Sequence, residues 1–139
     1  MTMSNSAPDA PPNPPSESAF KSKGGLRRVW HAATYSMAGF RAAWRHEAAF
    51  RQELLVGLPL IVLAPFIAPG RWQLLAMVAS VVAVLIVELL NSAIEALADA
   101  LTVERHPLLG RAKDLGSAAV MLSLLGVVFT WALVLWPKR

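Results

Sequence analysis

The sequence lacks several features that would narrow its function at once. Its 139 residues include no cysteine, which excludes disulfide bonds and metal sites built on thiolates. The usual signatures of nucleotide binding are also absent, since there is no Walker loop, no Rossmann glycine fingerprint and no protein-kinase motif. The first residues lack the apolar core of a signal peptide. Any chemistry must therefore be carried by a different pattern of residues.

Proline is concentrated at the beginning of the chain. Five of the ten prolines lie within residues 1–22, among serine, asparagine and alanine. Prolines block helices and sheets, and this stretch has little apolar surface to bury. We therefore expect residues 1–23 to form a disordered, proline-rich tail that precedes one domain at residues 24–139.

Apolar residues make up 55% of the chain, which is more than soluble proteins usually contain. They form three runs, at about residues 54–68, 74–101 and 115–136. A soluble helical bundle with this sequence would have no polar outer face on its third helix. The sequence therefore predicts an all-α integral membrane protein with three transmembrane helices. Including their flanking residues, these spans are expected at about residues 48–68, 74–101 and 113–136. In the loop before the third span, Pro107 and Gly110 are expected to mark turns.

The basic residues are distributed unevenly around these spans. Seven of the thirteen lysines and arginines precede the first apolar run, one lies between the first and second runs, and three lie between the second and third. The positive-inside rule then places the N-terminus and the second loop in the cytoplasm. Two basic residues at the end of the chain, Lys138 and Arg139, oppose this assignment. Because the basic residues flank membrane spans, no nucleic-acid partner is expected.

Residues 25–47 have the pattern of an amphipathic helix. Trp30 and Trp44 belong to its apolar side, and Arg27 and Arg41 to its basic side. A basic amphipathic helix that carries tryptophans is typical of a helix lying in the membrane interface. We therefore expect an N-terminal interfacial helix before the first span.

Smaller patterns occur at the ends of the spans. Glu47 and Arg51 have i,i+4 spacing, for which a surface ion pair is the simplest interpretation. Trp131 and Trp136 are expected in the aromatic belt of the outer interface. Residues 116–119 are all small, so another helix can approach closely there.

A stripe of polar residues occupies the last third of the second apolar run. At about 100° per residue, Glu88, Ser92, Glu95 and Asp99 fall within an arc of roughly 60°, and Asn91 lies just beside them. Burying a carboxylate in a bilayer is costly, so this stripe needs water, a metal ion or a cationic partner. A polar seam that only holds helices together seldom needs three acids.

Further reactive groups are expected at the same membrane level. Glu47 lies just before the first span, and Lys113 and Asp114 open the third. Carboxylates suit magnesium, a lysine suits a phosphate oxygen, and a remaining carboxylate can accept a proton from a hydroxyl. This set fits phosphoryl transfer, in which catalysis is mostly positioning and charge neutralisation. From spacing alone, a membrane enzyme ranks only slightly above an ion or proton pathway.

Three segments closely resemble the prokaryotic integral-membrane diacylglycerol kinase family, and its Gram-negative branch in particular. They are RAAWRHEAAFRQE at residues 41–53, ELLNSAIEA at residues 88–96 and GRAKDLGSAA at residues 110–119. The order and spacing of segments agree over about residues 25–136. The most specific part is the pattern Glu-x-x-Asn-x-x-x-Glu followed by Lys-Asp.

The resemblance implies a homotrimeric bundle in the bacterial inner membrane, with sites between neighbouring subunits at the cytoplasmic interface. The implied reaction transfers the γ-phosphate of MgATP to diacylglycerol and gives phosphatidic acid. By this resemblance Glu88 is the general base and Asn91 orients the centre. Glu47 and Glu95 hold the magnesium, and Lys113 neutralises the transferring phosphate.

The resemblance also implies wider binding sets. The nucleotide would contact Arg28, Tyr35, Glu47, Glu95, Asp99, His106, Gly110, Lys113 and Asp114, and the lipid would contact Ala33, Glu53, Glu88 and Ser117.

One residue departs from the family pattern, and several alternative functions stay open. His31 stands where the family commonly has a lysine, which weakens one positive charge near the phosphates at neutral pH. An undecaprenol kinase is the alternative within the family, although residues 48–53 favour diacylglycerol. A small ion- or proton-conducting subunit would use the acidic stripe but leave Lys113 and Asp114 without a role. A purely structural helical assembly would not need the acids.

Overall fold

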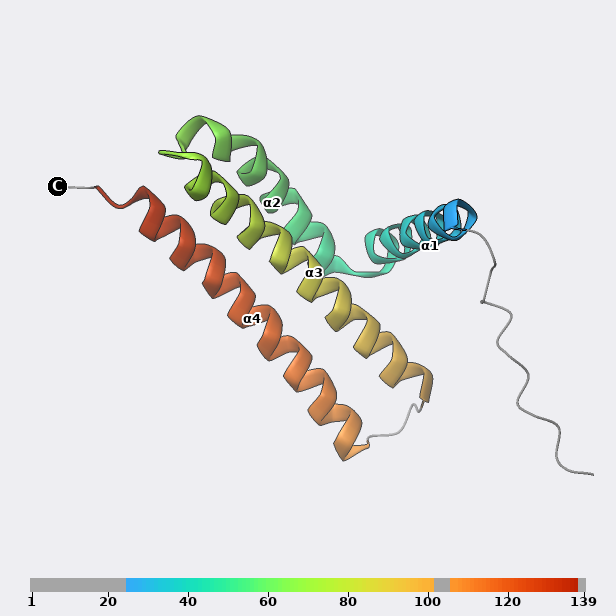
Figure 1. The fold of residues 1–139 in the computed structure, drawn as a ribbon. Helices are drawn as coiled ribbons and strands as arrows, with labels where there is room; N and C mark the ends of the chain where they lie inside the picture. The colour runs from blue at the N-terminus through green and yellow to red at the C-terminus, as the bar shows by residue number, and fades with distance from the viewer. Residues whose placement is uncertain (1–24, 102–105, 138–139) are drawn as a thin grey trace, which may run out of the picture. The chain divides into compact units, whose positions relative to one another are not determined.

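The computed structural model describes residues 25–101 and 106–137, almost all of which lie in helices (Figure 1). The expected tail at residues 1–23 lies outside the described residues. The helices are α1 (Gly25–His46), α2 (Ala48–Ile67), α3 (Arg71–Leu101) and α4 (Pro107–Leu135). Three of them, α2, α3 and α4, are long and apolar enough to cross a membrane. The predicted all-α membrane fold is confirmed.

Helix α3 lies between α2 and α4 and packs against both (Figure 1). Because only residues 68–70 connect α2 to α3, these two helices must run antiparallel as neighbours. The centre of the packing is a cluster in which Ala64 of α2 and Trp131 of α4 meet Met77 and Val81 of α3. This apolar cluster joins all three long helices at one level.

Helix α4 begins six residues earlier than the expected span. His106 is its N-cap, with its Nδ1 accepting a hydrogen bond of 3.3 Å from the backbone N–H of Leu108. Pro107 was expected to mark a turn, but proline is well tolerated in the first helical turn because the N–H it lacks would have no partner there. The turn expected at Gly110 is also wrong, since its backbone N–H donates to the His106 carbonyl at 3.0 Å.

The connection between α1 and α2 is a single extended residue held by an arginine. Glu47 has φ −103° and ψ 111°. Arg51 Nη1 donates to the carbonyl oxygens of Trp44 and Arg45, at 2.9 and 3.4 Å. The carbonyls of the last helical turn have no hydrogen-bond partner within the helix, so they compete well with the Glu47 carboxylate for the Arg51 guanidinium. The expectation of a Glu47–Arg51 ion pair is therefore wrong, since the Arg51 guanidinium binds these carbonyls and the ion pair found among the described residues is Lys113–Asp99.

Trp131 lies inside the bundle and not in an outer aromatic belt. Its side chain is only 9% exposed, and its Nε1 donates to the Met77 carbonyl of α3 at 3.4 Å. The expectation for this residue is wrong because the packing of α3 against α4 offers the indole both apolar contact and an acceptor. Trp136 is exposed, and its place in a belt stays a prediction.

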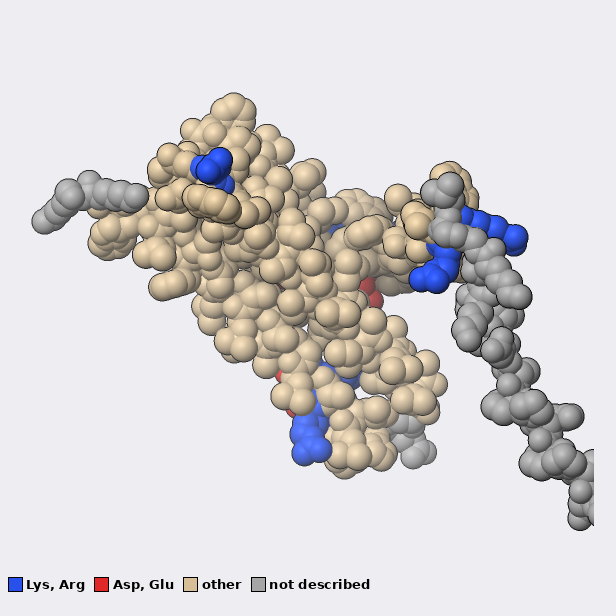
Figure 2. Space-filling view, viewed as in Figure 1, with Lys and Arg blue, Asp and Glu red and all other residues tan. Residues whose placement is uncertain are grey.

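Most of the large apolar side chains on α2, α3 and α4 are exposed in the single chain. Helix α4 buries only Gly116 and Trp131. Figure 2 shows a largely uncharged surface over this helix, with charged atoms gathered where α3 ends and α4 begins. Such a surface is typical of a protein that is covered by lipid or by further protein.

Candidate active site

The lengths of α3 and α4 determine how deep their polar residues can lie. At 1.5 Å per residue, the 31 residues of α3 span about 46 Å, whereas the hydrocarbon core of a bilayer is about 30 Å thick. About 20 residues counted from Arg71 reach Leu90. Glu88 and Asn91 then lie near the edge of the hydrocarbon, and Asp99 lies beyond it, among headgroups and water.

The same count on α4 locates the edge of the hydrocarbon on this helix. About 20 residues counted back from Leu135 reach Gly116. Lys113 and Asp114 therefore lie outside the hydrocarbon, beside the last turns of α3. The membrane dimensions and the antiparallel packing together collect the polar residues of both helices at one interface.

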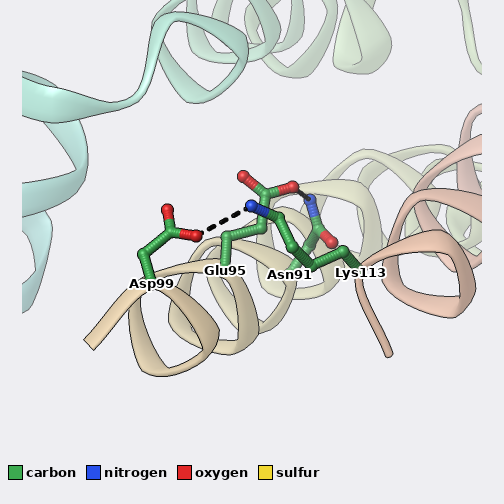
Figure 3. A network of polar contacts seen from close by, with 4 residues as sticks. All are labelled: Asn91, Glu95, Asp99 and Lys113. Carbon is green, nitrogen blue, oxygen red and sulfur yellow. Dashed lines mark hydrogen bonds and ion pairs between the residues drawn. The ribbon is translucent and has the colours of Figure 1, made fainter. Parts of the chain in front are cut away.

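Two polar contacts connect four residues at this level (Figure 3). Asn91 Nδ2 donates to Glu95 Oε1 at 3.1 Å, one turn further along α3. Lys113 Nζ reaches across from α4 and donates to Asp99 Oδ1 at 3.0 Å. The side chains of Lys113 and Asp99 are 39% and 70% exposed, so this ion pair is accessible to solvent.

Glu88 is the most enclosed acid of the stripe, with 3% of its surface exposed. The negative charges of Glu95 and Glu47 act on it, and Glu88 in turn acts on Glu53. Glu88 is thus close enough to three other acids, Glu47, Glu53 and Glu95, for their charges to interact. Carboxylates gathered in this way repel each other unless a cation lies near them.

Several buried polar atoms in this region have no hydrogen-bond partner among the described residues. They are Asn91 Oδ1, Ser92 Oγ and Glu53 Oε2. Buried polar groups in folded proteins are nearly always paired, and the exceptions often mark ligand or catalytic sites. The three atoms are therefore consistent with a site that is completed by bound molecules.

The acids suit magnesium only together with a ligand that supplies further oxygens. Within the described residues, no three His, Cys, Asp or Glu side chains are grouped closely enough to hold a metal ion. Magnesium commonly takes one or two carboxylates and completes its coordination with phosphate oxygens and water. Glu47 and Glu95, each partly buried, fit this role as a pair beside a nucleotide.

Two of the remaining predicted site residues do not join this cluster within the single chain. Asp114 and Ser117 are exposed on α4, and no hydrogen bond or ion pair is recorded for either side chain within the described part. Three others, Arg28, Ala33 and Tyr35, lie on the part of α1 that precedes Ala38, and all three are exposed. His31 lies on the same part, and its Nε2 accepts a hydrogen bond from Arg27 Nε at 3.5 Å.

Two features of the site were not predicted from the sequence. One is the Lys113–Asp99 ion pair. The sequence pattern that could have revealed it is a pair of opposite charges on either side of the short loop between two antiparallel helices. The other is the close approach of Gly116 to the Asn91 side chain. The small residues at 116–119 predicted a close helix contact, but not its partner.

Comparison with known proteins assigns the chain to a family. The family model described as prokaryotic diacylglycerol kinase matches residues 34–135, which is most of the chain. The chain belongs to this kinase family. The resemblance seen in the sequence is therefore confirmed, and the chain is an enzyme.

Individual relatives agree with this assignment over nearly their whole length. The chain is 49% identical to the diacylglycerol kinase of Pseudomonas aeruginosa over 120 residues, which cover 86% of this chain and 98% of the relative. It is 47% identical to the diacylglycerol kinase of Escherichia coli K12 over 112 residues, or 81% and 92% of the two chains. The diacylglycerol kinase of Haemophilus influenzae is 39% identical over 112 residues, or 81% and 95%.

Proposed function

We propose that this enzyme transfers the γ-phosphate of ATP to the free hydroxyl of diacylglycerol and produces phosphatidic acid. The relatives named above carry the name of this activity. The observation that carries the proposal most directly is the position of Glu88. It is a buried acid at the edge of the hydrocarbon, followed one turn later on α3 by the Asn91–Glu95 pair. Further along, Lys113 of α4 pairs with Asp99.

Glu88 is the general base of the proposed reaction. It lies about 10 Å deeper along α3 than Glu95, a rise of seven residues, so a lipid hydroxyl can reach it from the bilayer. In the transfer, the hydroxyl oxygen bonds to the γ-phosphorus and the bond from this phosphorus to ADP breaks. The proton of the hydroxyl passes to the Glu88 carboxylate. Asn91, through its hydrogen bond to Glu95, fixes the position of the Glu95 carboxylate relative to the base Glu88.

Glu47 and Glu95 would hold Mg²⁺ together with the phosphates of the nucleotide. When it is bound, this ion neutralises phosphate charge, which is the main requirement of phosphoryl transfer.

Lys113 would neutralise the phosphate that is transferred. Its ammonium carries three donors, of which Asp99 takes one. The remaining donors can bind phosphate oxygens while Asp99 keeps the lysine beside α3. Arg28 and Tyr35 would contact the nucleotide, as the resemblance implies, together with Asp114 and the residues at the start of α4.

The proposed assembly is a homotrimer in the inner membrane, with the N-terminus in the cytoplasm and α1 in the interface. The extensive exposed apolar surface of the single chain supports coverage by other subunits and by lipid. The placement of basic residues supports the orientation.

Transfer of radioactive phosphate from ATP to purified lipid acceptors tests the proposal. The purified protein is expected to label diacylglycerol in the presence of Mg²⁺ and to label undecaprenol far less. Labelling of undecaprenol alone would identify a polyprenol kinase and refute the proposed substrate. Labelling of neither lipid would refute the proposed function.

A further inference from the structure

Helix α4 approaches the polar stripe of α3 closely at a glycine. Gly116 is buried, and a Cβ atom added to it would overlap Asn91 Oδ1. The same Cβ would lie 3.3 Å from Asn91 Cγ and 3.8 Å from Asn91 Cα. In glycine this direction is occupied by a hydrogen, so a Cα–H of Gly116 faces the amide oxygen. Such Cα–H···O contacts occur regularly where two helices pack closely.

The Asn91 amide is held from two sides by this arrangement. Its Nδ2 donates to Glu95 Oε1, while its Oδ1 faces Gly116 and has no hydrogen-bond partner among the described residues. A flipped amide would place the oxygen against the Glu95 carboxylate and lose the hydrogen bond. Since Asn91 is only 8% exposed, no bulk water is available to compensate. The space left by Gly116 is therefore what allows this orientation of the amide.

We propose that Gly116 is a positioning residue of the active site, acting through Asn91 on Glu95. The proposal rests on the proposed function, in which Asn91 and Glu95 belong to the phosphoryl-transfer centre. Gly116 itself contacts neither substrate. Its contribution is the absence of a side chain at the one place where a methyl group would displace the amide.

A Gly116→Ala substitution is expected to disturb the amide more than the helix packing. The overlapping atom is the end of a side chain, whereas the backbone of Asn91 remains at an ordinary contact distance from the new Cβ. Rotation of the amide away from Glu95 therefore relieves the overlap without separating α3 from α4. Misplacement of a catalytic group by about 1 Å can cost about a hundredfold in rate. We expect the kcat of Gly116→Ala to fall by about tenfold or more, with a nearly unchanged thermal unfolding midpoint.

Two glycines of the same chain provide matched controls. Gly126 lies in α4, and a Cβ there meets nothing within 4 Å. Gly57 lies in α2, where a Cβ would lie 2.8 Å from Val81 Cγ1 of α3, which is again a side-chain end but one without a polar partner. Alanine has a higher helix propensity than glycine at all three positions, so the resulting gain in stability is similar in the three variants and cancels when they are compared. Gly126→Ala and Gly57→Ala are expected to keep the wild-type kcat per folded protein.

The decisive comparison removes the amide. Asn91→Ala and the Asn91→Ala/Gly116→Ala double variant are expected to have the same kcat, because the methyl group no longer displaces a functional group. A further tenfold loss in the double variant would overturn the proposal, since Gly116 would then act by another route. A wild-type kcat for Gly116→Ala, or an equal loss in Gly57→Ala, would also overturn it.

A second measurement does not depend on activity. The side-chain amide signal of Asn91 in a ¹⁵N–¹H spectrum is identified by its disappearance in Asn91→Ala. It is expected to shift in both Glu95→Gln and Gly116→Ala, and to stay in place in Gly57→Ala. An unchanged signal in Gly116→Ala would refute the proposed geometry. If the wild-type enzyme transfers no phosphate to diacylglycerol, the proposed function fails, and this signal decides the geometry alone.

Discussion

Replacement of Glu88 by glutamine separates the proposed base from the proposed nucleotide site. Glutamine has nearly the same shape as glutamate, so the packing around a side chain that is only 3% exposed is kept. The substitution also removes one negative charge that interacts with Glu95 and Glu47. A neutral side chain is less costly than a charged one at this depth, so the folded protein is expected to be at least as stable. A loss of activity would then reflect chemistry and not unfolding.

The size of the effect follows from the role assigned to Glu88. A positioned general base contributes about 10²–10⁴-fold in rate, or about 2.7–5.4 kcal/mol in activation free energy. The proposed nucleotide site at Glu95 lies about 10 Å further along α3, so the affinity for MgATP is expected to change little. Glu88→Gln should therefore lower kcat by about a hundredfold or more and leave MgATP binding largely intact. Glu95→Gln should weaken both nucleotide binding and turnover.

Steady-state rates at saturating ATP, together with a nucleotide titration, measure both quantities for each variant. Ser80→Ala is a suitable control, because Ser80 is a partly buried polar residue of α3 whose hydroxyl donates to the Met77 carbonyl within its own helix. Near-normal turnover in Glu88→Gln, or a loss confined to nucleotide affinity, would refute the assignment of the base. The stripe would then have to be interpreted as a metal site along its whole length.

Further predictions concern the nucleotide contact, the packing and the assembly. Asp99→Ala should raise the KM for ATP about twofold to fivefold by releasing Lys113, as expected for an exposed ion pair, and this effect should vanish in a Lys113→Ala background. Trp131→Phe should lower stability by about 0.5–1 kcal/mol in reversible unfolding, because the bond to the Met77 carbonyl is lost; an unchanged midpoint would show that this bond contributes nothing. A reporter fused at Arg139 should behave as periplasmic, and cytoplasmic activity would contradict the predicted orientation. Cross-linking in detergent should give trimers, whereas a fully active monomer would exclude a site shared between subunits.

The sequence predicted the helices and the polar stripe because both depend on local patterns. Long apolar runs have few alternatives to helices that cross a membrane, and the spacing of Glu88, Glu95 and Asp99 places them on one face by helix geometry alone. Contacts between helices depend on rotation and register, which single-chain patterns do not determine. This is why the Lys113–Asp99 pair and the contact of Gly116 with Asn91 were missed.

The wrong expectations have a common physical origin. Arg51 and Trp131 were assigned to partners or surfaces that their residue types usually prefer. In the structure both bind backbone carbonyls, and such acceptors are invisible in a sequence pattern. Pro107 was interpreted as a break, although its position in the first helical turn removes the usual penalty.

The apolar cluster around Met77 and Trp131 lies about 27 Å along the bundle from Glu95, a rise of eighteen residues on α3. The two regions share a helix but no side chains. Substitutions in the cluster can therefore adapt the helix packing to a thicker, thinner or warmer membrane without altering the residues at the other end of the bundle. Conversely, substitutions near the proposed lipid site at Glu88 can change the acceptor while the apolar cluster keeps the helices together.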